Sequence, residues 1–216
     1  MSFELIPEDL QAYCDNHSSQ ENEVLKNLNR HTNANILQPR MISGHFQGRF
    51  LSMISNMIKP KYILEIGTYT GYSALCLAEG LQENGKLFTI DVNPENEDLV
   101  NEYIEKAGMN SKIRHIIGDA YQIIRTLNHH FDLVFIDADK PNYERYYDLV
   151  MEIIPSGGYI LLDNVLWSGK VLNEKALEKD KDTKILHHLN QKIRADNRVE
   201  NILLPLRDGL MLVRKL

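Results

Sequence analysis

From residue 62 onward, short apolar runs alternate with longer amphipathic stretches, and this alternation limits most what the chain can fold into. The apolar runs lie at 62–66, 87–91, 113–117, 131–137 and 159–163. Helical patterns lie between them at 72–81, 94–107, 120–127 and 143–154. Strands and helices in strict turn are typical of βαβ units, so the sequence predicts a doubly wound, mostly parallel sheet.

The N-terminal quarter of the chain departs from this alternation. Residues 7–58 repeat apolar side chains at helical spacing, as at Phe50, Ile54 and Ile58, and Pro39 interrupts between two helical stretches. We expect a helical cap over residues 1–58.

The C-terminal part departs from it as well. Residues 182–194 have one more helical pattern, and the apolar runs 199–204 and 210–213 flank a turn at 205–209. Two antiparallel strands are expected there. Residues 172–184 are rich in Lys, Glu and Asp and are expected to form an exposed loop.

The fold expected from these patterns is α/β: a Rossmann-like, doubly wound, mostly parallel seven-stranded sheet with a C-terminal antiparallel hairpin. The 216 residues, 43% of them hydrophobic, are enough for one sizeable core. We therefore expect a single domain over 1–216, with the helical cap at 1–58 and the Rossmann-like core at 59–216.

Charge and composition favour a small-molecule partner. The net charge of −6 and the pI near 5.8 predict no general attraction to nucleic-acid phosphates or anionic membranes. No apolar run approaches the roughly 20 residues that span a bilayer, and residues 1–5 lack a signal-sequence pattern. We expect a cytoplasmic protein whose two cysteines, Cys14 and Cys76, are reduced.

Two short acidic runs each close an apolar strand, and they predict a metal site. Asp137 follows the strand at 131–137, and Asp163 and Asn164 close the strand at 159–163. In an open parallel sheet, ligands bind outside the carboxyl ends of the strands. Carboxylate and amide oxygens suit Mg²⁺, and the absence of nearby His or Cys argues against zinc.

A plainer interpretation exists for either run alone. Asp137 and Asp139 could cap the following segment, and Lys140 could be a solvated surface charge. The two runs together favour the metal site. Asp139 is expected to stabilise its loop rather than to bind metal.

Glycines and acids on three consecutive strand ends predict a nucleoside site. Gly67 and Gly71 follow the first strand, but they are not the glycines of a GxGxxG motif. Asp91 ends the second strand, where an acid accepts hydrogen bonds from ribose hydroxyls, and Asp119 follows the third, within reach of an adenine amino group. Each alone could be a turn glycine or a helix cap; the succession of three favours a bound nucleoside.

These residues resemble the class I S-adenosylmethionine-dependent O-methyltransferases, specifically the cation-dependent group that contains the catechol and caffeoyl-CoA O-methyltransferases. The likeness runs from about Gln38 to the C-terminus. The most specific segments are 64–73 (LEIGTYTGYS), 135–140 (FIDADK), 163–169 (DNVLWSG) and 207–209 (RDG).

The resemblance assigns roles residue by residue. The cofactor-binding residues that it implies are Met41, Ile42, Ser43, Glu65, Gly67, Tyr69, Ser73, Asp91, Asp119, Ala120 and Asp137. Glu65, Gly67, Tyr69 and Ser73 would hold the methionine half of S-adenosylmethionine. Asp91 would hold the ribose, and Asp119 with Ala120 the adenine.

The same resemblance extends to the metal and the substrate. Asp137, Asp163 and Asn164 would bind Mg²⁺, or another divalent cation such as Mn²⁺ or Ca²⁺. Lys140 would be the general base, because a lysine beside a cation can lose its proton near neutral pH. Lys140, Asn164 and Trp167 would contact the substrate, although a packing role for Trp167 is an open alternative.

The sequence departs from relatives at two places. Many relatives carry Glu where Gln47 aligns. The side chain that is expected to contact the methionine end of the cofactor is therefore uncharged here, or another residue makes this contact. The Glu near the C-terminus with which animal catechol enzymes hold the second hydroxyl has no match before Arg207.

The expected activity is Mg²⁺-dependent transfer of the methyl group of S-adenosylmethionine to a hydroxyl of a catechol-type phenolic, by a homodimer like the bacterial and plant relatives. One alternative is a tRNA hydroxyuridine methyltransferase, with a basic patch from Arg40, Arg49, Lys170 and Lys175. A nucleotide-binding dehydrogenase or a non-catalytic module is disfavoured by the missing GxGxxG and by the paired acidic motifs.

Overall fold

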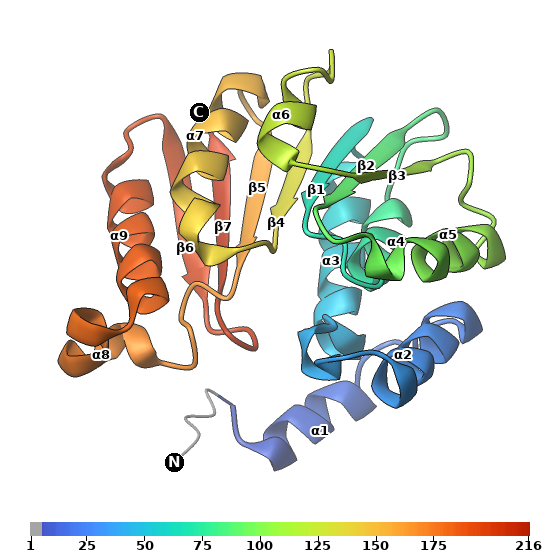
Figure 1. Ribbon diagram of the computed structural model, residues 1–216, viewed down its shortest axis with the longest axis horizontal. Coiled ribbons are helices and arrows are strands. Elements are labelled where there is room, and N and C mark those ends of the chain that lie inside the picture. Colours follow the sequence, from blue (N-terminus) through green and yellow to red (C-terminus); the bar gives the residue numbers. More distant parts are fainter. Residues whose placement is uncertain (1–5) are drawn as a thin grey trace.

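The computed structural model describes residues 6–216 and contains a seven-stranded sheet in the order β3-β2-β1-β4-β5-β7-β6 (Figure 1). The strands are β1 (Tyr62–Ile66), β2 (Lys86–Asp91), β3 (Ile113–Ile117), β4 (Leu133–Ile136), β5 (Tyr159–Asp163), β6 (Val199–Leu204) and β7 (Leu210–Lys215). The first five pair in parallel, and β7 pairs antiparallel with both β5 and β6. The predicted doubly wound sheet with a terminal hairpin is confirmed.

Helices flank this sheet, and all but α8 lie in segments that the patterns predict as helical. They are α1 (Glu8–Asn16), α2 (Glu23–Asn35), α3 (Gly44–Ile58), α4 (Tyr72–Ala78), α5 (Glu97–Lys106), α6 (Ala120–Ile124), α7 (Tyr143–Ile153), α8 (Glu174–Lys179) and α9 (Lys181–Ala195). Short 3₁₀ turns lie at Pro39–Met41, Pro94–Asn96, Lys140–Asn142 and Lys170–Leu172.

The prediction of an exposed loop at 172–184 is wrong, because this segment contains α8 and the start of α9. Two side-chain caps explain the difference. The Asn173 carboxamide accepts a hydrogen bond from the Ala176 backbone N–H, and the Asp180 carboxylate accepts from the Asp182 and Thr183 backbone N–H groups. Such caps satisfy donors that a helix leaves unpaired at its start, so a strongly charged segment can still be helical.

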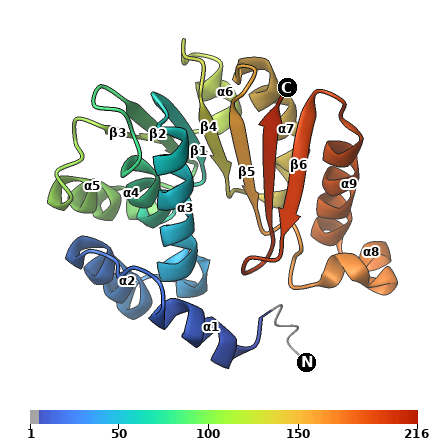
Figure 2. The ribbon, with the colours of Figure 1, turned by 180° about the vertical axis from the view of Figure 1, so that it is seen from behind.

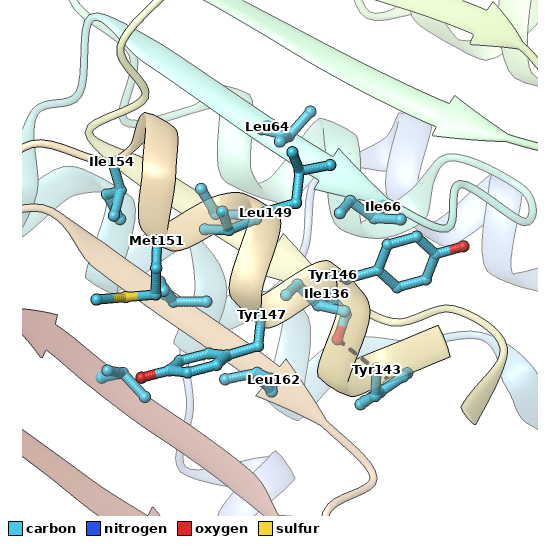
Figure 3. Packing of buried hydrophobic residues seen from close by; sticks show 14 of the residues in the cluster. Leu64, Ile66, Ile136, Tyr143, Tyr146, Tyr147, Leu149, Met151, Ile154 and Leu162 are labelled. Atoms are coloured by element: carbon cyan, nitrogen blue, oxygen red, sulfur yellow. Dashed lines mark hydrogen bonds between the residues drawn. The ribbon is translucent and has the colours of Figure 1, made fainter. Parts of the chain in front are cut away.

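Side chains alternate between the two faces of each strand, and helices bury both faces. Helices α6, α7 and α9 cover one face of the sheet and α3 to α5 the other (Figures 1 and 2). Leu64 and Ile66 of β1 pack in the first of these layers, whereas Ile63 packs in the second. Figure 3 shows the first of these two layers, in which Tyr146 and Tyr147 of α7 lie among aliphatic side chains of the sheet. Tyr143, Tyr146 and Tyr147 of α7 are all buried in this cluster.

The expected N-terminal helical cap is also present. Helix α2 buries Leu25 and Leu28 against the α3 to α5 layer. Helix α1 has no buried residue and lies beside the N-terminal end of α3 (Figure 2). The His45 ring contacts the Asp15 carboxylate at 3.3 Å through Nδ1 and the Ser19 carbonyl oxygen at 2.8 Å through Nε2.

Both cysteines are free thiols, as expected. Burial raises the pKa of the Cys76 thiol to about 12, so this side chain is an inert core group. Residues 1–5, in which a signal sequence was sought, lie outside the described residues. Within residues 6–216, none of the helices combines the length and the apolar character that a membrane crossing requires.

Candidate active site

A cavity of about 1710 Å³ lies at the carboxyl ends of the parallel strands, which is where α/β sheets bind ligands. Pockets for one small molecule are typically about 300–1,000 Å³, so this cavity has room for two ligands side by side. The sequence-predicted residues that line it are Met41, Ile42, Ser43, Gly67, Tyr69, Ser73, Asp91, Asp119, Ala120, Asp137, Lys140, Asp163, Asn164 and Trp167. The structure therefore brings all but one of the predicted site residues to one place.

The glycine turn after β1 is in close contact with residues at the ends of β2 and β4. Gly67 has a φ of +98°, and a Cβ atom at this position would lie 1.8 Å from the Asp137 backbone oxygen. The Asp91 carboxylate accepts hydrogen bonds from the backbone N–H groups of Thr68 (3.0 Å) and Tyr69 (2.9 Å). Asp91 thus holds the turn as well as lining the cavity, so the plain structural role and the ribose role are compatible.

Glu65 is the predicted site residue that does not line the cavity. It is fully buried at the end of β1, and neither carboxylate oxygen has a hydrogen-bond partner among the described residues. Burial raises the pKa of Glu65 to about 8, against the opposing effect of the nearby Ser73 and Thr89 hydroxyls. A buried carboxyl group without a partner is destabilising, so this group is suited to a ligand that brings hydrogen-bond donors.

The third strand end carries a helix cap that also lines the cavity. Asp119 accepts a hydrogen bond from the Tyr121 backbone N–H at 2.9 Å and begins α6. Tyr121 lies between two guanidinium groups, 3.4 Å from Arg145 and 4.1 Å from Arg125 to the ring centroid. The sequence patterns did not indicate this stack, because its members come from two different helices.

Two carboxylates and an amide converge at the ends of β4 and β5. Asp163 is 3% exposed, and its Oδ1 atom accepts a hydrogen bond from the Asn164 backbone N–H at 2.8 Å. Burial and the neighbouring Asp163 carboxylate raise the pKa of Asp137 to about 6, although the charges of Lys140 and Arg207 oppose the shift. Crowded carboxylates of this kind are stabilised by an added cation.

Lys140 is a buried member of this cluster. Its side-chain amino group donates to Tyr143 Oη (2.6 Å), Asn164 Oδ1 (2.7 Å) and the Ala138 carbonyl (3.1 Å), and it lies 3.6 Å from Asp137 Oδ1. The interpretation of Lys140 as a solvated surface charge is therefore wrong.

The neighbouring Asp139 stays with its own loop. Its carboxylate accepts hydrogen bonds from Asn142 Nδ2 (2.6 Å) and Tyr146 Oη (3.0 Å), as the expectation of a loop-stabilising role requires. It makes no side-chain cap at the following turn.

Trp167 lies on the loop after β5, and its ring lines the cavity. The Lys140 and Lys170 amino groups are 5.8 and 5.6 Å from its ring centroid. The indole N–H is buried without a partner in the described part of the chain. The loop is joined to the 207–209 turn, because the Val165 and Leu166 N–H groups donate to the Gly209 and Asp208 carbonyls.

Arg207 joins the turn at 207–209 to α3 and to the segment that precedes it. Its guanidinium donates to the Ile42 carbonyl at 2.9 Å, to the Ser43 carbonyl, and to Gln47 Oε1 at 3.3 Å. The RDG motif marked this turn as part of the family resemblance, but the contacts of Arg207 span 160 or more positions and no local pattern encodes them.

Comparisons with known proteins agree with this geometry. An O-methyltransferase family model matches residues 15–216. A caffeoyl-CoA O-methyltransferase of Petroselinum crispum is 35% identical over 206 residues, which cover 91% of this chain and 85% of that protein.

Solved structures give the same result. An O-methyltransferase from Bacillus cereus, in complex with SAH, has a TM-score of 0.86 at 28% identity and covers 96% of this chain and 97% of that one. The SAH-bound Podospora anserina methyltransferase PaMTH1 has a TM-score of 0.88 at 28% identity, with coverage of 97% and 94%. The chain belongs to the O-methyltransferase family and is an S-adenosylmethionine-dependent O-methyltransferase of the type represented by the caffeoyl-CoA O-methyltransferases.

Proposed function

We propose that this enzyme methylates one hydroxyl of a catechol-type phenolic small molecule, with a divalent cation, Mg²⁺ or else Mn²⁺ or Ca²⁺, bound by Asp137, Asp163 and Asn164. The observation that carries the proposal is the crowding of the buried Asp163 carboxylate, the half-buried Asp137 carboxylate and one amide oxygen on the cavity wall, with the pKa of Asp137 raised to about 6. Hard oxygen ligands of this kind suit these cations. The bound cation would supply positive charge to stabilise a phenolate.

Side chains of the enzyme would supply proton transfer and would hold the substrate. Lys140, buried and fixed by three hydrogen bonds, would take the hydroxyl proton at Nζ. Trp167 would form an aromatic wall for the phenolic ring. Holding the nucleophilic oxygen in line with the transferable methyl group would provide a large part of the rate enhancement.

The cofactor would lie along the β1 to β3 side of the same cavity. Met41, Ile42, Ser43, Glu65, Gly67, Tyr69, Ser73 and Asp137 would surround its methionine half, Asp91 its ribose, and Asp119 with Ala120 its adenine. The unpartnered carboxylate of Glu65 supports this placement, because the ammonium of a methionine moiety brings the donors that Glu65 lacks.

The proposal is tested by incubating the enzyme with S-adenosylmethionine, Mg²⁺ and caffeate, protocatechuate or caffeoyl-CoA, and measuring methylated product by mass. Asp163→Ala and Lys140→Met should each lower kcat/KM by at least about 100-fold, as the loss of a metal ligand or a general base does. Asp148→Asn, on the surface of α7 and paired with Lys192, is the control. Wild-type turnover by the Asp163→Ala variant would contradict the proposal.

The tRNA alternative receives no support from the side-chain contacts. Arg49 pairs with Glu79 at 2.9 Å and Lys170 pairs with Asp180 at 3.0 Å, so two of the four cations in the expected basic patch are neutralised. RNA binding with a steep salt dependence would reopen this alternative. Family membership makes the dehydrogenase and the non-catalytic module wrong.

We also propose that the enzyme is a homodimer, and a cytoplasmic location stays a prediction from the sequence. Met53 and Met57, one helical turn apart on α3, are 61% and 74% exposed, which suits a contact with a second copy. Light scattering after gel filtration should give about twice the 25.0 kDa chain mass. Met53→Lys with Met57→Lys should halve that value; a monomeric wild type would contradict the proposal.

A further inference from the structure

Gln47 is a buried amide between the two halves of the site. It lies on α3, is 1% exposed, and uses both ends of its carboxamide. Its Nε2 atom donates to Asp163 Oδ2 at 2.6 Å, and its Oε1 atom accepts from Arg207 Nη1 at 3.3 Å.

The orientation of this amide follows from its partners. A guanidinium can only donate and an ionised carboxylate can only accept, so the Gln47 oxygen must face Arg207 and the NH₂ group must face Asp163. Arg207 is itself fixed by the Ile42 and Ser43 carbonyls. The hydrogen bonds therefore run in one direction, from Arg207 through Gln47 to Asp163.

Asp163 is held at both oxygens as a result. Oδ1 accepts from the Asn164 N–H at 2.8 Å, and Oδ2 accepts from Gln47. Each oxygen keeps a second lone pair for another partner. Two donors on opposite oxygens fix the rotation of the carboxylate within the cavity wall.

We propose that Gln47, oriented by Arg207, is a positioning residue that fixes the Asp163 carboxylate for binding a divalent cation. This inference rests on the proposed function, since it assumes that Asp163 is a metal ligand. Arg207 has a second role, because the guanidinium that orients Gln47 also anchors the segment at Ile42 and Ser43. That segment lines the cavity, so the metal side and the α3 side of the site share one anchor.

The test measures Mn²⁺ affinity by calorimetry on metal-stripped protein, and turnover as a function of Mg²⁺ concentration. Gln47→Met keeps the side-chain length and removes both hydrogen bonds. It should raise the Kd for Mn²⁺ by about 10- to 100-fold, the usual effect of removing a partner of a metal ligand. Saturating Mg²⁺ should restore its kcat, which distinguishes it from Asp163→Ala.

Arg207→Lys gives an independent variant, because an ammonium cannot reach three acceptors with the geometry of the guanidinium fork. It should raise the Kd for Mn²⁺, and in the double variant the two effects should not add, as expected of residues in one chain of contacts. If Gln47→Met folds poorly, Arg207→Lys alone decides the outcome.

Ser52→Ala is the matched control. Ser52 is also buried on α3 and also donates to a carboxylate, Glu79, at 2.5 Å, but it lies outside the cavity lining. Its loss should lower Tm and leave the Kd for Mn²⁺ unchanged. Wild-type protein that binds no Mn²⁺ would overturn the proposed metal site itself. Wild-type binding with an unchanged Kd in the folded Gln47→Met and Arg207→Lys variants would overturn the positioning role alone.

Discussion

Individual side chains in this site both stabilise the local backbone and line the cavity. Asp91 holds the glycine turn through two backbone N–H groups and also lines the cavity, and Asp119 caps α6 while doing the same. A carboxylate has about four lone-pair positions, so one or two internal hydrogen bonds leave room for a ligand. The choice between cap and binding residue that the sequence posed is therefore not exclusive.

Gly67 is required by a close backbone approach. Gly67→Ala would place Cβ 1.8 Å from the Asp137 oxygen, so β1 and β4 would have to separate. Gly157→Ala is the control, because Gly157 has a similar φ of +83° but nothing within 4 Å. In urea unfolding we expect the control to lose about 1 kcal/mol and Gly67→Ala to lose about 1–3 kcal/mol more from overpacking. Equal losses in the two variants would mean that the close approach has no energetic effect.

Glu65 should make the stability of the ligand-free enzyme depend on pH. Its pKa of about 8 in the folded state lies above the usual value, so between these two values only the folded state keeps the proton. The free energy of unfolding therefore falls as the pH rises towards 8. Glu65→Gln removes this loss and should gain on the order of 4 kcal/mol relative to wild type between pH 5 and pH 8, at about 1.4 kcal/mol per pH unit. A stability difference that does not change with pH, measured by urea unfolding, would contradict the raised pKa.

Residue types at the site were predictable from sequence, but their contacts were not. Asp137, Asp163 and Asn164 stand out because each closes or follows an apolar strand. Gln47 lies 116 positions from Asp163, and only the packing of α3 against the sheet brings them together. The unpartnered carboxylate of Glu65 likewise depends on tertiary burial, which local patterns do not encode.

At the scale of elements, regular strands and helices were predictable where apolar periodicity was strong. Helix α8 was missed because its sequence, EKALEK, is mostly charged, and its start depends on the Asn173 cap. Strand β4 begins at Leu133, two residues later than the apolar run at 131–137. The Asp132 carboxylate accepts from the Lys61 and Tyr62 N–H groups there, beside the backbone hydrogen bonds that Asp132 makes with Tyr62 and Tyr159. A side-chain hydrogen bond, rather than hydropathy, sets the start of α8.

Asp180 should stabilise the α8–α9 corner mainly as a helix cap. Asp180→Ala removes the acceptor for two N–H groups of α9 and should destabilise the protein by about 1 kcal/mol. Asp180→Asn keeps an acceptor and loses only the exposed pair with Lys170, which is worth little. Urea unfolding should therefore rank Asp180→Ala below Asp180→Asn, and equal losses in the two variants would show that the ion pair, rather than the cap, accounts for the effect of Asp180.

At the scale of the whole molecule, the order of strands decides where chemistry can occur. The chain starts its sheet with β1, next to the central strand, adds β2 and β3 on one side, and then adds β4 and the remaining strands on the other side. Crevices open at such a reversal, between the ends of β1 and β4, and here Gly67 and Asp137 meet across it. Strand and helix alternation predicted this architecture, and the acidic strand ends predicted its ligand-binding edge.

The most direct test of the account is catechol methylation with the metal removed. Purified enzyme with S-adenosylmethionine and caffeate or protocatechuate should form methylated product with Mg²⁺. EDTA should abolish the reaction, and excess Mg²⁺ should restore it. Unchanged methylation in EDTA would contradict the role proposed for Asp137, Asp163 and Asn164.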